Sequence, residues 1–82
     1  MTDTTYRIEV EYTDTFGGEA NYCWVRRATL DVPKGSSDTR IMRRAKAAIG
    51  ITGARGRTNR FGDEWHFRPY GCCTVMMAWV VY

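Results

Sequence analysis

The chain has 82 residues, which fits one domain and leaves little room for a second, so we expect residues 1–82 to form a single domain. Apolar residues make up 44% of the chain and aromatic residues 13%, which excludes a disordered tail. The net charge of +3 is modest, and a chain this short has little volume for a deep active-site cleft.

The first predicted strand covers residues 5–12, in which apolar and polar side chains alternate, starting with Tyr6 and ending with Tyr12. This period of two is typical of a half-buried strand. Residues 14–19 then have the composition of a turn, because Gly17 and Gly18 adopt positive φ at little cost.

A second strand is predicted at residues 20–32, and the two strands together indicate a long antiparallel hairpin. Arg26 interrupts its apolar face, so either a bulge near residues 26–27 resets the alternation or Arg26 lies at the rim of the sheet. The aromatic side chains of both strands are expected to pack beneath a helix rather than to form a stacking platform: Tyr6, Tyr12, Tyr22 and Trp24.

A helix is predicted from residue 37 or 38 to residue 49. Ser36 or Ser37 can cap its first turn, and Gly50 is a natural end. Apolar residues recur at helical spacing between Ile41 and Ile49, which indicates a buried stripe.

The remainder is expected to hold two strands. Residues 51–62 are rich in Gly and Arg and are predicted to be a mobile loop, with at most a short strand near residues 57–61. Residues 64–68 and 72–81 are predicted strands, and the second is apolar on nearly both faces, as a central strand is. The predicted fold is therefore α+β with order β-β-α-β-β, a four-stranded antiparallel sheet with one helix packed on one face.

The distribution of charge is the most informative feature for function. Residues 1–31 hold six acids and three bases, whereas residues 40–60 hold seven bases and no acid. An anionic partner, either nucleic acid or an acidic protein surface, is favoured over an idle basic surface because uncompensated cations repel each other. The candidate binding residues are Arg40, Arg43, Arg44, Lys46, Arg55, Arg57 and Arg60.

No pattern in the sequence indicates catalysis, a metal or a cofactor, so we do not expect an enzyme. The three cysteines lack zinc-site spacing and are expected to be free, buried thiols. His66 has no nucleophile and acid beside it in sequence. Without a targeting signal or an apolar run of membrane-spanning length, we expect a cytoplasmic protein that does not contact a membrane.

Residues 12–27, followed by residues 44–50 and the Gly-Arg loop, resemble small proteins of phages and prophages. Small phage proteins with this layout are similar to anti-CRISPR proteins, which are stoichiometric inhibitors of CRISPR effector complexes. The resemblance implies a protein that acts in the host cytoplasm by docking on a multi-subunit, Cascade-type effector and blocking DNA binding or nuclease recruitment. Many anti-CRISPR proteins are acidic DNA mimics, and this basic chain departs from that pattern.

Under this hypothesis the basic residues make electrostatic contact with an acidic or aromatic protein surface. The turn between the first two strands, with Phe16, Gly17 and Glu19, is a second candidate edge. The alternative is a small basic nucleic-acid-binding protein that uses the same arginines on phosphates. The apolar last strand is compatible with a monomer or a homodimer.

Overall fold

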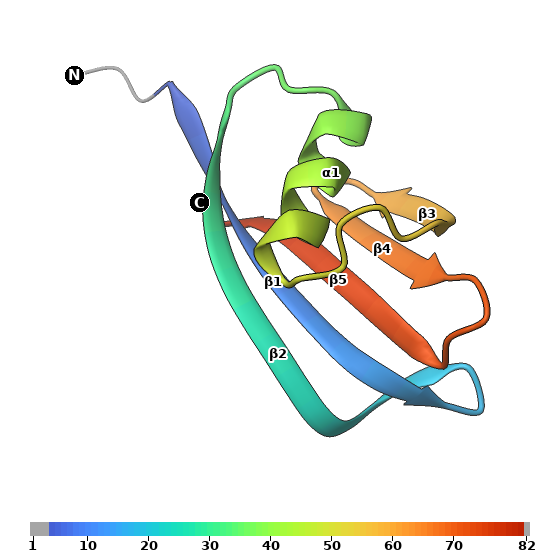
Figure 1. Ribbon diagram of the computed structural model, residues 1–82. Helices are drawn as coiled ribbons and strands as arrows, with labels where there is room; N and C mark the ends of the chain where they lie inside the picture. The colour runs from blue at the N-terminus through green and yellow to red at the C-terminus, as the bar shows by residue number, and fades with distance from the viewer. Residues whose placement is uncertain (1–3, 82) are drawn as a thin grey trace.

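The computed structural model describes residues 4–81 as a twisted antiparallel sheet with one helix on one face (Figure 1). In chain order the elements are β1 (Thr5–Phe16), β2 (Glu19–Pro33), α1 (Asp38–Ala48), β3 (Gly56–Phe61), β4 (Glu64–Pro69) and β5 (Thr74–Val81). The strand order is β2-β1-β5-β4-β3, and each neighbouring pair is antiparallel. The predicted α+β class and the single covering helix are confirmed.

The predicted number of strands is wrong, because the sheet has five strands rather than four. Residues 56–61, expected to be largely loop, pair with β4 along their whole length as β3. Phe61 lies opposite Glu64, so Gly62 and Asp63 form a two-residue hairpin turn, and Gly62 has the positive φ of 62° that such turns require. The element order is therefore β-β-α-β-β-β.

Helix α1 begins where the sequence predicted and ends at Ala48, one residue before the predicted end, with Ile49 as its C-cap. The Ser37 hydroxyl accepts a hydrogen bond from the Arg40 amide at 3.2 Å, and Asp38 places a negative charge in the first turn. At the other end, Arg26 Nη1 donates to the Ile49 carbonyl oxygen at 2.7 Å. A cation from β2 thus satisfies a carbonyl that the last turn leaves without an intrahelical donor.

This contact also explains why Arg26 interrupts the apolar face of β2. Arg26 pairs regularly with Tyr12, so no bulge lies at residues 26–27, and its guanidinium carbon is 6.0 Å from the Tyr12 ring centroid. Of the two predicted alternatives, the rim position is correct. The register of the hairpin instead shifts between Thr13 and Thr15, nearer its tip.

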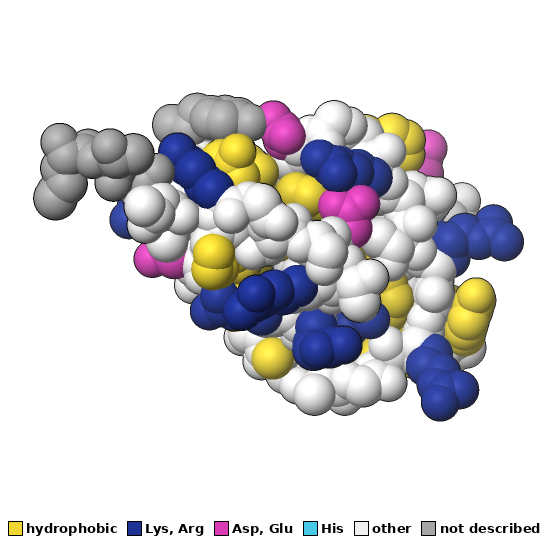
Figure 2. All heavy atoms as spheres, turned by 90° about the horizontal axis from the view of Figure 1, so that it is seen from above, with side chains coloured by type: hydrophobic (Ala, Val, Ile, Leu, Met, Phe, Trp, Pro, Cys, Tyr) yellow, Lys and Arg dark blue, Asp and Glu magenta, His cyan; other side chains and the backbone are white. Residues whose placement is uncertain are grey.

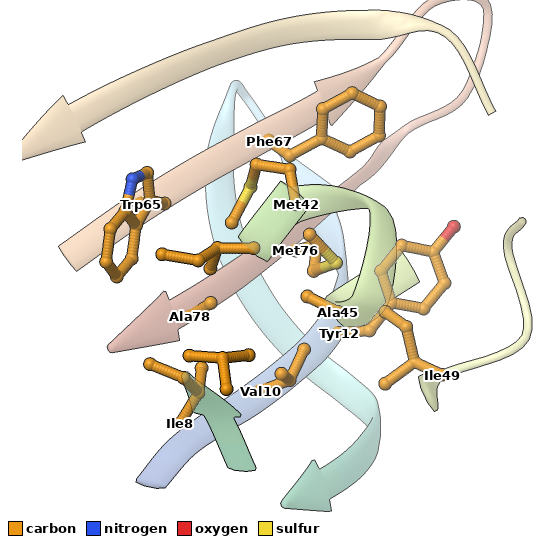
Figure 3. Close-up of a cluster of buried hydrophobic side chains, with 12 residues drawn as sticks. Ile8, Val10, Tyr12, Met42, Ala45, Ile49, Trp65, Phe67, Met76 and Ala78 are labelled. Carbon is orange, nitrogen blue, oxygen red and sulfur yellow. The ribbon is translucent and has the colours of Figure 1, made fainter. Parts of the chain in front are cut away.

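The core lies between α1 and the helix-facing side chains of β1, β2, β4 and β5 (Figure 3). Strand β5 runs between β1 and β4, as its apolar sequence predicted. The buried side chains are Ile8, Val10, Tyr12, Val32, Ile41, Met42, Ala45, Ile49, Trp65, Phe67, Met76 and Ala78. Among residues 4–81, no helix combines the length and apolar character needed to cross a bilayer.

Candidate protein-binding groove

A groove of about 550 Å³ lies between α1, the connection that follows it and β3. Its exposed atoms are mostly apolar, although buried Met42 and half-buried Ala54 are the two apolar side chains in its lining. Polar and charged side chains complete the lining: Asp38, Thr39, Arg43, Lys46, Thr52 and Thr58, with Gly53 between them. A concave surface that combines apolar atoms with polar groups of defined position is a usual form of a binding site.

Lys46 is held in place on one wall of the groove. Its ammonium group donates to the Ala54 carbonyl oxygen at 3.1 Å and lies 4.1 Å from the centroid of the Phe67 ring. The cation therefore ties the connection after α1 to the helix and rests on an aromatic face in the core. A half-buried charge in a fixed position loses less conformational entropy on binding than a mobile surface lysine.

Arg60 pairs with Asp38, the carboxylate in the groove lining. Arg60 Nη1 lies 2.9 Å from Asp38 Oδ1, and Arg60 Nε donates to the Gly62 carbonyl oxygen at 2.7 Å. The same guanidinium is 5.2 Å from the Trp65 ring centroid. The positive charge of Arg60 is therefore largely neutralised by Asp38. The Asp38 carboxylate, in turn, no longer offsets the positive charges of Arg43 and Lys46.

The other predicted cations do not gather into one patch. On α1, Arg43 lies with Thr39 and Lys46 on the flank that lines the groove, whereas Arg44 is turned about 100° further round the helix. Exposed Arg40 lies on the outer surface of α1. Figure 2 shows the Lys and Arg side chains of this face in separate groups with other residues between them.

The predicted cations in β3 and in the connection before it are also separated from one another. Arg55 is exposed in the connection before β3, and Arg57 and Arg60 lie on opposite faces of the sheet because their positions differ by an odd number. Within residues 4–81, Arg40, Arg43, Arg44, Arg55 and Arg57 form no ion pair. Of the seven predicted cations, the groove brings together Arg43 and Lys46.

Phe16 and Glu19, the second predicted edge, lie far from the groove. They face each other at the tip of the β1–β2 hairpin, which extends away from α1 in a molecule of 45 × 23 × 21 Å (Figure 1). Phe16 is 79% exposed. The tip and the groove are therefore two separate surfaces.

The sequence did not reveal an irregular segment of β2 close to this tip. Between the pairs Thr13–Val25 and Thr15–Ala20, residues 21–24 of β2 lie opposite Asp14 alone. The Asp14 carboxylate accepts hydrogen bonds from the side chain of Asn21 and the amide of Cys23, each at 2.9 Å. A short polar side chain opposite a break in alternation was the signal that could have identified this bulge.

Thr13 anchors the other half of the bulge. Its buried hydroxyl donates to the Trp24 carbonyl oxygen at 2.8 Å and accepts from the Tyr22 amide at 3.1 Å. Tyr22 is held at a positive φ of 56°, which is uncommon for a bulky residue. Its side chain and that of Trp24 are 52% and 43% exposed, so the prediction that both pack under the helix is wrong.

The cysteines are free, but the prediction that they are buried is also wrong. Cys23 lies in the bulge of β2, and Cys72 and Cys73 lie in the turn between β4 and β5. All three side chains are exposed. The Cys73 carbonyl oxygen accepts from the Thr15 amide at 2.8 Å, which joins this turn to the hairpin. Burial favours apolar side chains on regular strands, and these positions are not on them.

The bulge leads to a prediction about pH. The hydrogen bond from Asn21, together with that from the Cys23 amide, lowers the pKa of Asp14 below the usual 3.8. A lowered pKa stabilises the bulge above pH 3.8, and this stabilisation is lost as the pH falls through the lowered value. We expect the protection of the Cys23 amide, its NMR exchange rate relative to the unstructured rate at the same pH, to fall only below pH 3.8, and Asp14→Asn to abolish this dependence. An unchanged profile in the variant would contradict the assignment.

His66 lies on the face of the sheet opposite α1, as alternation predicted. Its Nε2 is 3.3 Å from Glu64 Oε2, without the alignment of a hydrogen bond, and its ring centroid is 5.1 Å from that of Phe61. Among the described residues, no three His, Cys, Asp or Glu side chains lie close enough to hold a metal ion.

The fold and the groove define a small α+β protein with a helix-flanked edge strand. No protein-family model, curated protein or solved structure matches this chain.

Proposed function

We propose that this chain is a binding protein that docks on an acidic protein surface through the groove between α1 and β3. One observation carries the proposal: the groove combines apolar surface at Met42 and Ala54 with the cations of Arg43 and Lys46, while its one carboxylate is paired with Arg60. Apolar area supplies affinity, and fixed charges select an acidic partner and repel a basic one.

We further propose that the partner is a subunit of a multi-subunit, Cascade-type CRISPR effector, and that the protein is a phage-encoded anti-CRISPR inhibitor. The support is the resemblance of residues 12–27 and 44–50 to small phage proteins, together with the size of the chain. The inhibitor acts in the host cytoplasm, one copy per site, by occluding target DNA or nuclease recruitment. Its exposed arginines fit a protein surface better than they would imitate a phosphate backbone.

Charge reversal on neighbouring helix residues tests this proposal. We expect Arg43→Glu to weaken binding of the purified effector complex at least tenfold, on the order of the loss for a truncated charge pair. Arg44→Glu is the matched control, because it makes the same charge change on the other flank of α1 and should bind within about twofold. Isothermal titration and inhibition of effector DNA binding are the measurements. Full inhibition by Arg43→Glu would contradict the groove as the interface.

Nucleic-acid binding is the second candidate, and it is favoured by Arg55 and Arg57, which form no ion pair with any other residue from 4 to 81. Phosphate contacts would make affinity fall steeply with salt, and both helix variants would lose binding alike, since long-range attraction depends on net charge. A mobility-shift titration of DNA and RNA at two salt concentrations separates the candidates. No shift at micromolar protein would discard this second function.

A further inference from the structure

We infer that the groove takes an extended acidic peptide segment of the partner, which adds to β3 as a sixth strand of the sheet. The inference rests on the proposed protein-binding function and specifies its geometry. Strand β3 is at the edge of the sheet, and among the described residues it pairs only with β4. An edge strand offers a row of backbone donors and acceptors to another chain.

The pairing pattern identifies which backbone groups are available. The Tyr70 amide donates to the Arg55 carbonyl oxygen at 2.9 Å, so the pair formed by these two residues is a hydrogen-bonded one. Such pairs alternate along an antiparallel ladder, so Arg57, Asn59 and Phe61 also direct their backbone groups toward β4. The amide and carbonyl of Thr58 between them consequently point outward, away from the sheet.

The groove lies on the helix-facing side of this edge. The Thr58 side chain is part of the groove lining, and the facing wall is formed by Met42, Arg43 and Lys46 of α1. A strand paired with β3 would lie about 4.8 Å from it and direct every second side chain toward α1. Apolar side chains in those positions meet Met42 and Ala54, and an acidic one meets Arg43.

The charges around β3 specify an acidic peptide. Exposed Arg55 and Arg57 carry no ion pair within residues 4–81, and neither does Arg43. These cations would repel a second copy of the same strand, which is how edge strands avoid pairing with themselves. The other edge of the sheet, β2, is interrupted by the bulge of residues 21–24, which breaks the regular row of backbone groups that an added strand needs. The acceptor edge is therefore β3.

Thr58→Pro tests strand addition directly. Proline removes the outward amide of Thr58 and leaves the ladder to β4 intact, because that ladder uses the backbone groups of Arg57 and Asn59. The matched control is Thr58→Ala, which loses the side chain and keeps the amide. The probe is a short synthetic peptide with Val at the α1-facing positions except one, where Glu can meet Arg43, and Glu at the alternate positions; it is titrated against labelled protein and followed by NMR amide shifts.

We expect the peptide to shift the amides of β3 and α1 and to protect the Thr58 amide from exchange. Thr58→Pro should weaken binding at least tenfold relative to Thr58→Ala, and a Val/Lys peptide should not bind. A second test leaves the protein unaltered and uses two N-methylated peptides, one methylated at the odd-numbered amides and the other at the even-numbered amides. Only one of these two sets of amides would face β3, so one of the two peptides should not bind. Equal affinity of both Thr58 variants, or of both N-methylated peptides and the parent, would overturn the inference.

Binding of the whole effector complex separates failure of this inference from failure of the proposed function. If Arg43→Glu loses binding and Thr58→Pro retains it, the groove is the interface and strand addition is wrong. If both variants bind like the unmodified chain, the proposed function is wrong as well. Loss in both variants supports both, provided that Arg44→Glu binds normally and Thr58→Pro binds at least tenfold more weakly than Thr58→Ala.

Discussion

Replacing Phe67 by Ala is expected to lower the free energy of unfolding by about 3–5 kcal/mol. Phe67 is 1% exposed on β4 and is among the largest fully buried side chains of the core, so its loss leaves a cavity beneath α1. A domain of this size has a total stability of about 5–10 kcal/mol, so the variant would be marginally folded at 25 °C. Urea denaturation followed by circular dichroism measures the change.

Phe61→Ala is the matched control, because it makes the same change on a ring that is 59% exposed on β3. We expect it to alter the free energy of unfolding by less than about 0.5 kcal/mol. Phe67→Leu retains most of the volume and should cost under about 1.5 kcal/mol, while it removes the aromatic face beneath Lys46. Similar losses for Phe67→Ala and Phe61→Ala would show that the core is not where the structure places it.

Much of the fold could be predicted because burial leaves a periodic pattern in the sequence. The alternation that begins at Tyr6 identified β1, the helical stripe ending at Ile49 identified α1, and a run apolar on both faces identified β5 as central. Strand β3 left no such pattern, because five of its six residues are exposed. Only the turn formed by Gly62 and Asp63 indicated a hairpin there.

The site was less predictable because it depends on contacts between residues far apart in the sequence. Arg60 and Asp38 are 22 positions apart in the sequence. Their ion pair neutralises one of the predicted cations and also the carboxylate in the groove lining. The position of Arg57 on the opposite face would have followed from strand periodicity, had residues 56–61 not been assigned mainly to a loop. Arg43 and Lys46 were correctly placed on the helix, and what they face could not be known without β3.

Gly56→Ala is expected to reduce the free energy of unfolding by about 1–3 kcal/mol, the usual cost of forcing an atom into a filled space. Gly56 begins β3 opposite Pro69, and an added Cβ would collide with the backbone carbonyl of Arg68 and lie 2.7 Å from the Pro69 Cα. Backbone atoms of a paired strand cannot rotate away, so the start of β3 must separate from β4. Thermal unfolding and NMR exchange of the Tyr70 amide measure the global and local effects.

Thr58→Ala serves again as the control, since it changes an exposed residue of the same strand and should leave stability within about 0.5 kcal/mol. In Gly56→Ala the Tyr70 amide should exchange faster, because its acceptor, the Arg55 carbonyl, precedes the displaced residue. Peptide binding should weaken too, because the displaced strand forms one wall of the groove. If Tyr70 stayed protected and binding were unchanged, the tight pairing of β3 with β4 that positions Thr58 opposite α1 would be wrong.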